Sequence, residues 1–223
     1  MIWDGDWTTI SMRTAETERM RRMLDAYGNH PSFCFFAIGN ELGSSNFKVM
    51  GDWIAEEKAR DPRRLYAGCG ARKQLTADDF WFTHDNGSRT RGVGPANTDW
   101  DFAKAAALSP VPLIAHETGQ RPAFPDYDTL LPKFTGPLLP LNLERYRRAM
   151  VANGLGGQLK DFVRASARFQ LTQYKAEHEA MLRTRGYAGY QLLMLNDFTG
   201  QSEALVGLLD PFWETKGVVS VAD

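Results

Sequence analysis

The sequence lacks the features that would tie it to a membrane, an oxidising compartment or a charged polymer. Its only two cysteines, Cys34 and Cys69, each lie in an apolar segment that predicts a buried strand, so we expect free thiols and no disulfide framework. No run of about 18 apolar residues predicts a membrane-spanning helix. The 26 Lys and Arg residues balance 27 Asp and Glu residues, so neither nucleic acid nor a membrane surface is expected as a partner.

Signatures of metal, nucleotide and serine-hydrolase sites are also missing. The four histidines have no paired spacing, so we expect no bound metal, and nothing calls for another cofactor. The Gly-rich stretch at residues 154–157 lies between predicted helices and is therefore no nucleotide fingerprint. No serine stands in a Gly-x-Ser-x-Gly elbow, which argues against an α/β-hydrolase.

The N-terminal residues carry neither a basic region nor an apolar core, so no secretory signal is predicted. The chain is either cytoplasmic or lacks its natural N-terminus, and a periplasmic or secreted parent protein stays open. The 223 residues, 43% of them hydrophobic, suffice for one α/β barrel or large sheet, and we expect a single domain over residues 1–223.

Two apolar runs end in a glutamate. Residues 33–41 predict a strand buried on both faces, as in a parallel sheet, and end in Asn40 and Glu41. Residues 111–117 repeat the pattern and end in His116 and Glu117. Parallel sheets build their sites at the carboxyl ends of their strands, so both glutamates are candidates for one site.

Helical and strand patterns alternate along the rest of the chain. We expect helices over residues 15–27, 47–60 and 99–108, and over 143–182 with a break at 154–157. We expect strands at 65–70, 80–85 and 189–195, and long loops at 86–99 and 118–140. This order argues for a parallel α/β sheet. Five strands, however, do not close an eight-stranded barrel.

Two glutamates at neighbouring strand ends suit glycoside cleavage, in which one carboxyl group donates a proton and the other attacks the anomeric carbon. The alternative is that Glu41 and Glu117 each pair with an arginine or cap the next helix. Both interpretations are open from the pattern alone.

Further polar residues lie at strand ends. Asn40 can donate to a sugar hydroxyl or close a turn. His84 and His116 suit either sugar contact or a structural hydrogen bond, although His116 and Glu117 point to opposite faces of an extended strand unless a bulge intervenes. Asn196 and Asp197 can bind hydroxyls or simply cap.

These residues carry a family resemblance. Tyr27-Gly28-Asn29-His30-Pro31-Ser32-Phe33, followed by Ala37-Ile38-Gly39-Asn40-Glu41, resembles the fourth-strand region of glycoside hydrolase family 2, the family of β-galactosidases and β-glucuronidases. Ile114-Ala115-His116-Glu117-Thr118-Gly119-Gln120 is similar to the end of its seventh strand. Residues 189–217 resemble the eighth-strand end in one branch of the family.

The resemblance implies a retaining glycosidase that acts on a carbohydrate, with Glu41 as acid/base, Asn40 at the sugar 2-hydroxyl and Glu117 as nucleophile. It also implies an α/β fold that is a partial (β/α)8 TIM barrel, with about strands 4 to 8 present and strands 1 to 3 missing. Exposed barrel edges would then pair with the missing barrel half or with a second copy. Two rivals stay open: a non-catalytic carbohydrate-binding or truncated remnant, and another α/β hydrolase that uses a metal.

Overall fold

The computed structural model describes residues 10–43, 46–89, 100–137, 139–198 and 205–218. The chain divides into two compact units. The first comprises Met1–Val93, Asp101–His116 and Met181–Gln191, and the second comprises Gly94–Trp100, Glu117–Ala180 and Leu192–Asp223. The interpretation of residues 1–223 as a single domain stays a prediction beside this division.

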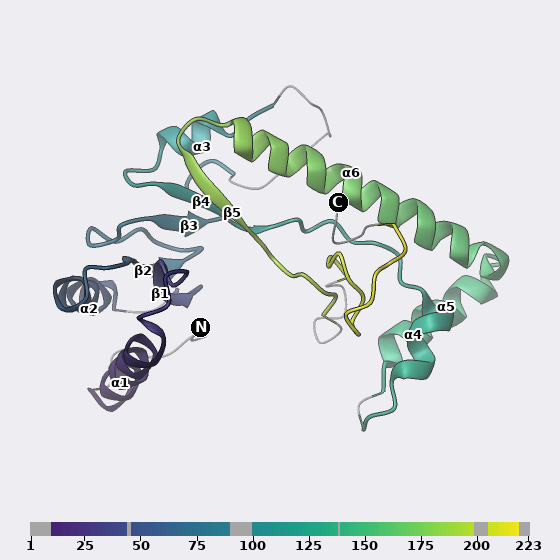
Figure 1. Cartoon of the computed structure of the whole chain (residues 1–223). Coiled ribbons are helices and arrows are strands. Elements are labelled where there is room, and N and C mark those ends of the chain that lie inside the picture. Colours follow the sequence, from purple (N-terminus) through teal and green to yellow (C-terminus); the bar gives the residue numbers. More distant parts are fainter. Residues whose placement is uncertain (1–9, 44–45, 90–99, 138, 199–204, 219–223) are drawn as a thin grey trace. The chain divides into compact units, whose positions relative to one another are not determined.

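The five strands expected from the sequence are present (Figure 1). They are β1 (Phe35–Asn40), β2 (Leu65–Gly70), β3 (Trp81–Thr83), β4 (Leu113–Thr118) and β5 (Tyr187–Leu192). β1 runs parallel to β2, β3 runs parallel to β4, and β5 completes the second sheet beside β4. The strands therefore form two short sheets.

An aspartate interrupts the pairing between β2 and β3. Tyr66 N donates to the Asp79 side chain at 2.9 Å, and Tyr66 O accepts from Asp79 N at 2.8 Å, so Asp79 takes the place of a strand neighbour. At the other end of β2, Ala71 N donates to Phe82 O at 3.0 Å. These bonds link the two sheets, and the strands follow one another in chain order from β1 to β5.

Helices α1 (Ile10–Tyr27) and α2 (Phe47–Arg60) cover the β1–β2 sheet, and the short α3 (Ala103–Ala107) lies before β4. One core cluster joins these elements, with Met20 and Leu24 from α1, Trp53 from α2 and Ile38 from β1. Met20, Leu24 and Trp53 lie in the helices expected over residues 15–27 and 47–60. The first helix, however, begins at Ile10 and not after Thr14 as expected.

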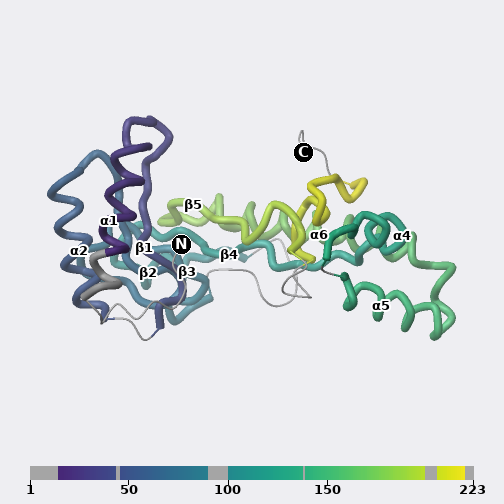
Figure 2. The backbone as a smooth tube through the Cα atoms, turned by 90° about the horizontal axis from the view of Figure 1, so that it is seen from below, coloured from purple at the N-terminus to yellow at the C-terminus, as the bar shows by residue number. Residues whose placement is uncertain are grey.

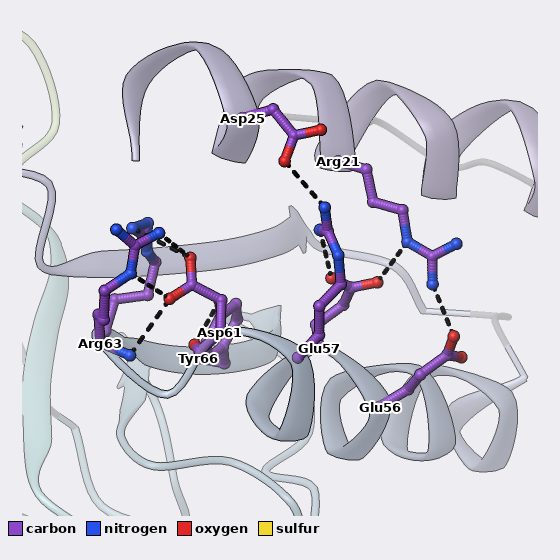
Figure 3. Close-up of polar contacts among 9 residues, drawn as sticks. Arg21, Asp25, Glu56, Glu57, Asp61, Arg63 and Tyr66 are labelled. Atoms are coloured by element: carbon purple, nitrogen blue, oxygen red, sulfur yellow. Dashed lines mark hydrogen bonds and ion pairs between the residues drawn. The ribbon is translucent and has the colours of Figure 1, made fainter. Parts of the chain in front are cut away.

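Charged side chains also fasten α1 to α2. Figure 3 shows Arg21 of α1 reaching both Glu56 and Glu57 of α2, at 2.6 and 2.8 Å. Arg60 donates to Glu57 at 3.2 Å and to Asp25 of α1 at 2.8 Å. Glu57 is fully buried, so its charge depends on these two guanidinium groups.

The second unit is largely helical. It contains α4 (Tyr127–Leu130), the 3-10 turn η1 (Leu131–Lys133), α5 (Leu141–Ala152), η2 (Gly156–Gln158) and most of α6 (Leu159–Arg183). α4 and α5 lie beside the N-terminal end of α6 (Figure 2), where Tyr127, Leu143 and Leu159 share a core. The segment expected to be a loop, residues 118–140, therefore contains two helical turns.

Three expectations about burial are wrong. β1 is buried only in its second half, since Phe35 at its start is 52% exposed. Cys34 is exposed, because it lies in the turn before β1, where its Sγ contacts Pro31 O at 3.3 Å. Cys69 is buried as expected, and burial raises the pKa of its thiol. β5 is not a buried strand, since none of its residues is buried and Tyr190 is 40% exposed.

Candidate active site

Glu41 lies directly after β1 in the first unit. Its backbone N donates to Gly70 O at 3.0 Å, which continues the β1–β2 pairing to the glutamate. Its φ is +54°, a left-handed conformation that ends the strand. The side chain is 31% exposed, and its Oε1 lies 3.6 Å from Arg72 Nη2. The carboxylate is therefore partly accessible and faces a cation.

Glu117 is the second-last residue of β4, and it is the residue of that strand at which the second unit begins. Its φ is +53°, its side chain is partly buried, and Gln120 Nε2 approaches Glu117 Oε2 at 3.5 Å. The expectation that His116 and Glu117 point to opposite faces assumes an extended backbone. Because Glu117 is left-handed, that alternation does not hold at this position.

Left-handed backbone recurs at the carboxyl ends of the strands. Among the described residues, the non-glycine residues with positive φ are Glu41, Ala71, Glu117 and Trp213. The first three follow or end β1, β2 and β4. Each such residue costs about 1–3 kcal/mol, and strain of this kind gathers at functional sites. Both predicted catalytic glutamates thus carry a backbone feature that folding alone disfavours.

A buried imidazole joins two amides in the first unit. His116 Nε2 lies 2.9 Å from Asn40 Oδ1, and His116 Nδ1 lies 2.7 Å from Gln191 Oε1. Asn40 is 3% exposed and His116 is 6% exposed. Side chains from β1, β4 and β5 therefore meet in one polar network.

Aromatic rings enclose this network. Phe82 meets the His116 ring edge-on at 5.2 Å between centroids, and His84 stacks on it at 6.4 Å. A Cβ atom at Gly70 would lie 2.0 Å from Phe82 and 2.8 Å from Asn40 Oδ1, so the close approach needs glycine.

Three of the residues predicted to contact sugar, Asn40, His84 and His116, thus come together in the first unit. The sequence interpretation missed Gln191 and Arg72. For Gln191 a signal existed, because it is a polar residue inside the last apolar strand run. Arg72 had none, since it lies in a polar loop like many other arginines.

Asn196 and Asp197 lie in the second unit and favour the capping alternative. Asp197 is 3% exposed, and its Oδ1 accepts from Gly207 N at 2.9 Å and from Lys216 Nζ at 2.8 Å. Burial raises the pKa of the Asp197 carboxyl and lowers the pKa of the Lys216 ammonium. Asn196 Nδ2 donates to Asp197 O at 3.1 Å. These contacts hold the C-terminal segment in place.

The described part of the chain offers no cluster of three or more His, Cys, Asp or Glu side chains placed to hold a metal ion. Among the helices it contains, none has the length and apolar character needed to cross a bilayer.

No family model matches the sequence, and no curated protein matches it either. Solved structures do match. A crystal structure of a GH2 β-galacturonidase from Eisenbergiella tayi bound to glycerol aligns with a TM-score of 0.53 and 13% identity, over 90% of this chain and 34% of that chain. The same enzyme bound to galacturonate aligns with a TM-score of 0.51 and 14% identity over the same shares.

The chain thus spans about a third of the length of these GH2 structures. At this identity the likeness concerns the fold alone. The chain has a fold similar to part of a GH2 glycoside hydrolase.

Proposed function

We propose that this chain carries the two catalytic carboxyl groups of a retaining glycosidase, with Glu41 as acid/base and Glu117 as nucleophile. One observation carries the proposal: each glutamate lies at the carboxyl end of a parallel strand on left-handed backbone. Parallel α/β folds place reactive groups at these ends, and the strain is a cost that a purely structural glutamate does not explain.

The reaction would proceed in two displacements. Glu117 attacks the anomeric carbon while Glu41 gives its proton to the departing glycosidic oxygen, which leaves a covalent glycosyl-enzyme. Glu41 then takes a proton from water, and the water oxygen displaces Glu117 from the sugar. In the active form this chemistry needs the two carboxyl groups roughly 5–5.5 Å apart.

We also propose that the five strands belong to a (β/α)8 barrel, as about its strands 4 to 8. Their chain order and the parallel pairings support this, as does the similarity to GH2 structures. The proposed substrate is a β-glycoside. Because the similar enzyme is a β-galacturonidase, an aryl β-galacturonide is the first substrate to test.

The test compares the full chain with Glu41→Gln and Glu117→Gln on aryl β-galacturonide, galactoside, glucuronide, glucoside and mannoside. Glu117→Gln should abolish hydrolysis of every active substrate, because no nucleophile remains. Glu41→Gln should lose about 100-fold or more on a poor leaving group and much less on a dinitrophenyl leaving group, which needs no proton to depart. Glu179→Gln, an exposed change on α6, is the matched control.

Other outcomes would overturn the proposal. A folded wild-type chain that hydrolyses none of these substrates but binds sugar would favour the non-catalytic carbohydrate-binding alternative. Hydrolysis that a chelator removes would favour the metal-dependent rival. Hydrolysis that persists in the Glu117→Gln variant would rule out Glu117 as the nucleophile.

A further inference from the structure

Arg72 is the cation that faces the proposed acid/base. It lies two residues after β2, and its Nη2 is 3.6 Å from Glu41 Oε1. The backbone fixes both residues at neighbouring strand ends. Glu41 N donates to Gly70 O at 3.0 Å, and Ala71 N donates to Phe82 O at 3.0 Å. Arg72 therefore follows directly from backbone that is hydrogen-bonded within the first unit.

The guanidinium group of Arg72 has hydrogen-bonding capacity to spare. In the part of the chain that the structure describes, its ionic contact is with Glu41 alone, and 3.6 Å is too long for a hydrogen bond. Arg21 and Arg63 in the same unit differ, since they donate to carboxylates at distances between 2.6 and 2.8 Å. The Arg72 side chain is 48% exposed, so its N–H groups are accessible to a ligand.

The charge that faces Arg72 changes during the proposed reaction. Glu41 has to be protonated before it gives its proton to the departing glycosidic oxygen, and it is ionised afterwards. Ionised Glu41 supplies a counter-charge to Arg72, whereas protonated Glu41 supplies none. While the substrate is intact, Arg72 is therefore a partly desolvated cation without its anion, and an anionic group of the substrate would replace that anion.

The leaving group is the part of the substrate that suits this exchange. An acid lies about 3 Å from the oxygen it protonates, so the guanidinium group, 3.6 Å from Glu41, lies within about 7 Å of that oxygen. A carboxylate on the sugar would remain while the sugar is bonded to Glu117, and would compete with ionised Glu41 for Arg72. A carboxylate on the leaving group departs with it and returns Arg72 to Glu41.

We propose that Arg72 binds a carboxylate on the leaving group of the substrate and so selects glycosides with an acidic aglycone. This inference rests on the proposed function and names a substrate class for it. The planar guanidinium group presents pairs of N–H donors that match the two oxygens of a carboxylate. When the aglycone has left, Arg72 faces the ionised Glu41, which then takes a proton from water.

The kinetic test compares two glycosides of the best sugar in the panel, one with 3-hydroxyphenylacetate and one with 3-hydroxyphenylacetamide as leaving group. The methylene group insulates the ring from the substituent, so the two phenols leave with similar ease and differ in charge. We expect wild-type kcat/KM to be about 5- to 20-fold higher on the acid, a gain limited by the exposure of Arg72. In Arg72→Gln the two values should agree within about twofold.

Two further variants sharpen this comparison. Arg72→Lys retains the charge but not the planar pair of donors, so its preference should lie between those of wild type and Arg72→Gln. Arg164→Gln is the matched control, because Arg164 is an exposed arginine of α6 that lies 2.6 Å from Asp161, and it should keep the wild-type preference. An equal preference in wild type and Arg72→Gln, or a wild-type preference for the amide, would overturn the proposal.

A second readout does not depend on activity. NMR titration measures the affinity of the full chain for free 3-hydroxyphenylacetate, with 3-hydroxyphenylacetamide as the uncharged control ligand. Glu41→Gln removes the anion that faces Arg72, so this variant should bind 3-hydroxyphenylacetate at least about threefold more tightly than wild type. The gain should be absent for the amide, and absent for both ligands when Arg72→Gln is added.

The two readouts separate the inference from the proposed function. A chain that hydrolyses nothing but shows the Arg72-dependent gain would keep the carboxylate site and lose the proposed reaction. Hydrolysis without an Arg72-dependent preference would keep the reaction and overturn the site. Equal affinity in all variants, or no measurable binding of 3-hydroxyphenylacetate, would also overturn the site.

Discussion

Asp78 has a buried carboxyl group beside β2. It is 5% exposed, and its two oxygens accept from Gly68 N and Leu75 N, each at 2.7 Å. Burial disfavours the charged form and raises the pKa of Asp78 from 3.8 to about 6, although the hydrogen bonds from the two backbone N–H groups oppose this shift. When the pKa of a carboxyl group is higher in the folded protein than in the unfolded chain, its contribution to stability is fully present at pH values below the unfolded-state pKa. That contribution is lost as the pH rises through the folded-state pKa.

We therefore expect Asp78 to cost the fold about 2–3 kcal/mol between pH 4 and pH 7. Asp78→Asn should be less stable at pH 4, because its NH2 group cannot accept one of the two backbone bonds, but should lose less stability on going to pH 7. Urea unfolding at pH 4, 5, 6 and 7 measures both slopes. Exposed Asp52→Asn should keep the wild-type slope. Parallel slopes for wild type and Asp78→Asn would contradict the burial effect.

Single residues were the hardest level to predict from the sequence. Glu41, Glu117 and Asn40 stood out because each ends an apolar run. The burial of Asp78 had no such signal, since it lies in a polar loop and depends on contacts with β2. Arg72 likewise reaches Glu41 only because both follow neighbouring strands.

Among the elements, α1 and α2 depend on the buried charge of Glu57. Its side chain is fully buried and receives Arg21 at 2.8 Å and Arg60 at 3.2 Å, whereas Glu56 beside it is 57% exposed (Figure 3). Truncating a buried partner leaves cations without their counter-charge and opens a void. An exposed pair contributes little.

Glu57→Ala should therefore destabilise the fold by about 2–3 kcal/mol, a value reduced because both arginines are partly exposed. Glu56→Ala should cost below about 1 kcal/mol. Urea midpoints at constant slope give both numbers. Equal losses for the two variants would show that burial of Glu57 does not govern the contact between the helices.

The helices and strands were the features best predicted from the sequence. Helical spacing located α2 and the cores of α1 and α6, and apolar runs located all five strands. The misses have physical causes. Residues 118–140 contain α4 and η1 despite their prolines, because Asp126 caps α4 through Thr129 N and Pro132 is tolerated near the start of η1.

For the whole molecule, the structure has two short sheets with parallel pairing of β1 with β2 and of β3 with β4, while the α/β fold class, the barrel and the convergence of Glu41 with Glu117 stay predictions. Chain order follows from the pattern, but the arrangement of strands in space depends on contacts between distant residues. The hydrogen bond from Tyr66 N to the Asp79 side chain is such a contact, and no local sequence pattern predicts it.

The edge of the first sheet carries the last prediction. In the described part of the chain this sheet ends at β1, and around it Tyr27, Phe35 and Leu65 are 59%, 52% and 44% exposed. An open edge with apolar side chains favours pairing with another chain. We expect the sedimentation coefficient of the chain to rise with concentration.

Phe35→Lys should reduce this association, because a charge on an edge strand opposes pairing. Phe169→Lys, which alters an equally exposed aromatic residue on α6, should leave it unchanged. The comparison separates a specific edge from general hydrophobicity, since both variants add one charge and remove one exposed ring. If Phe169→Lys lowered the association as much as Phe35→Lys, the β1 edge would not be its cause. A wild-type chain that stays monomeric across the dilution series would contradict the expectation outright.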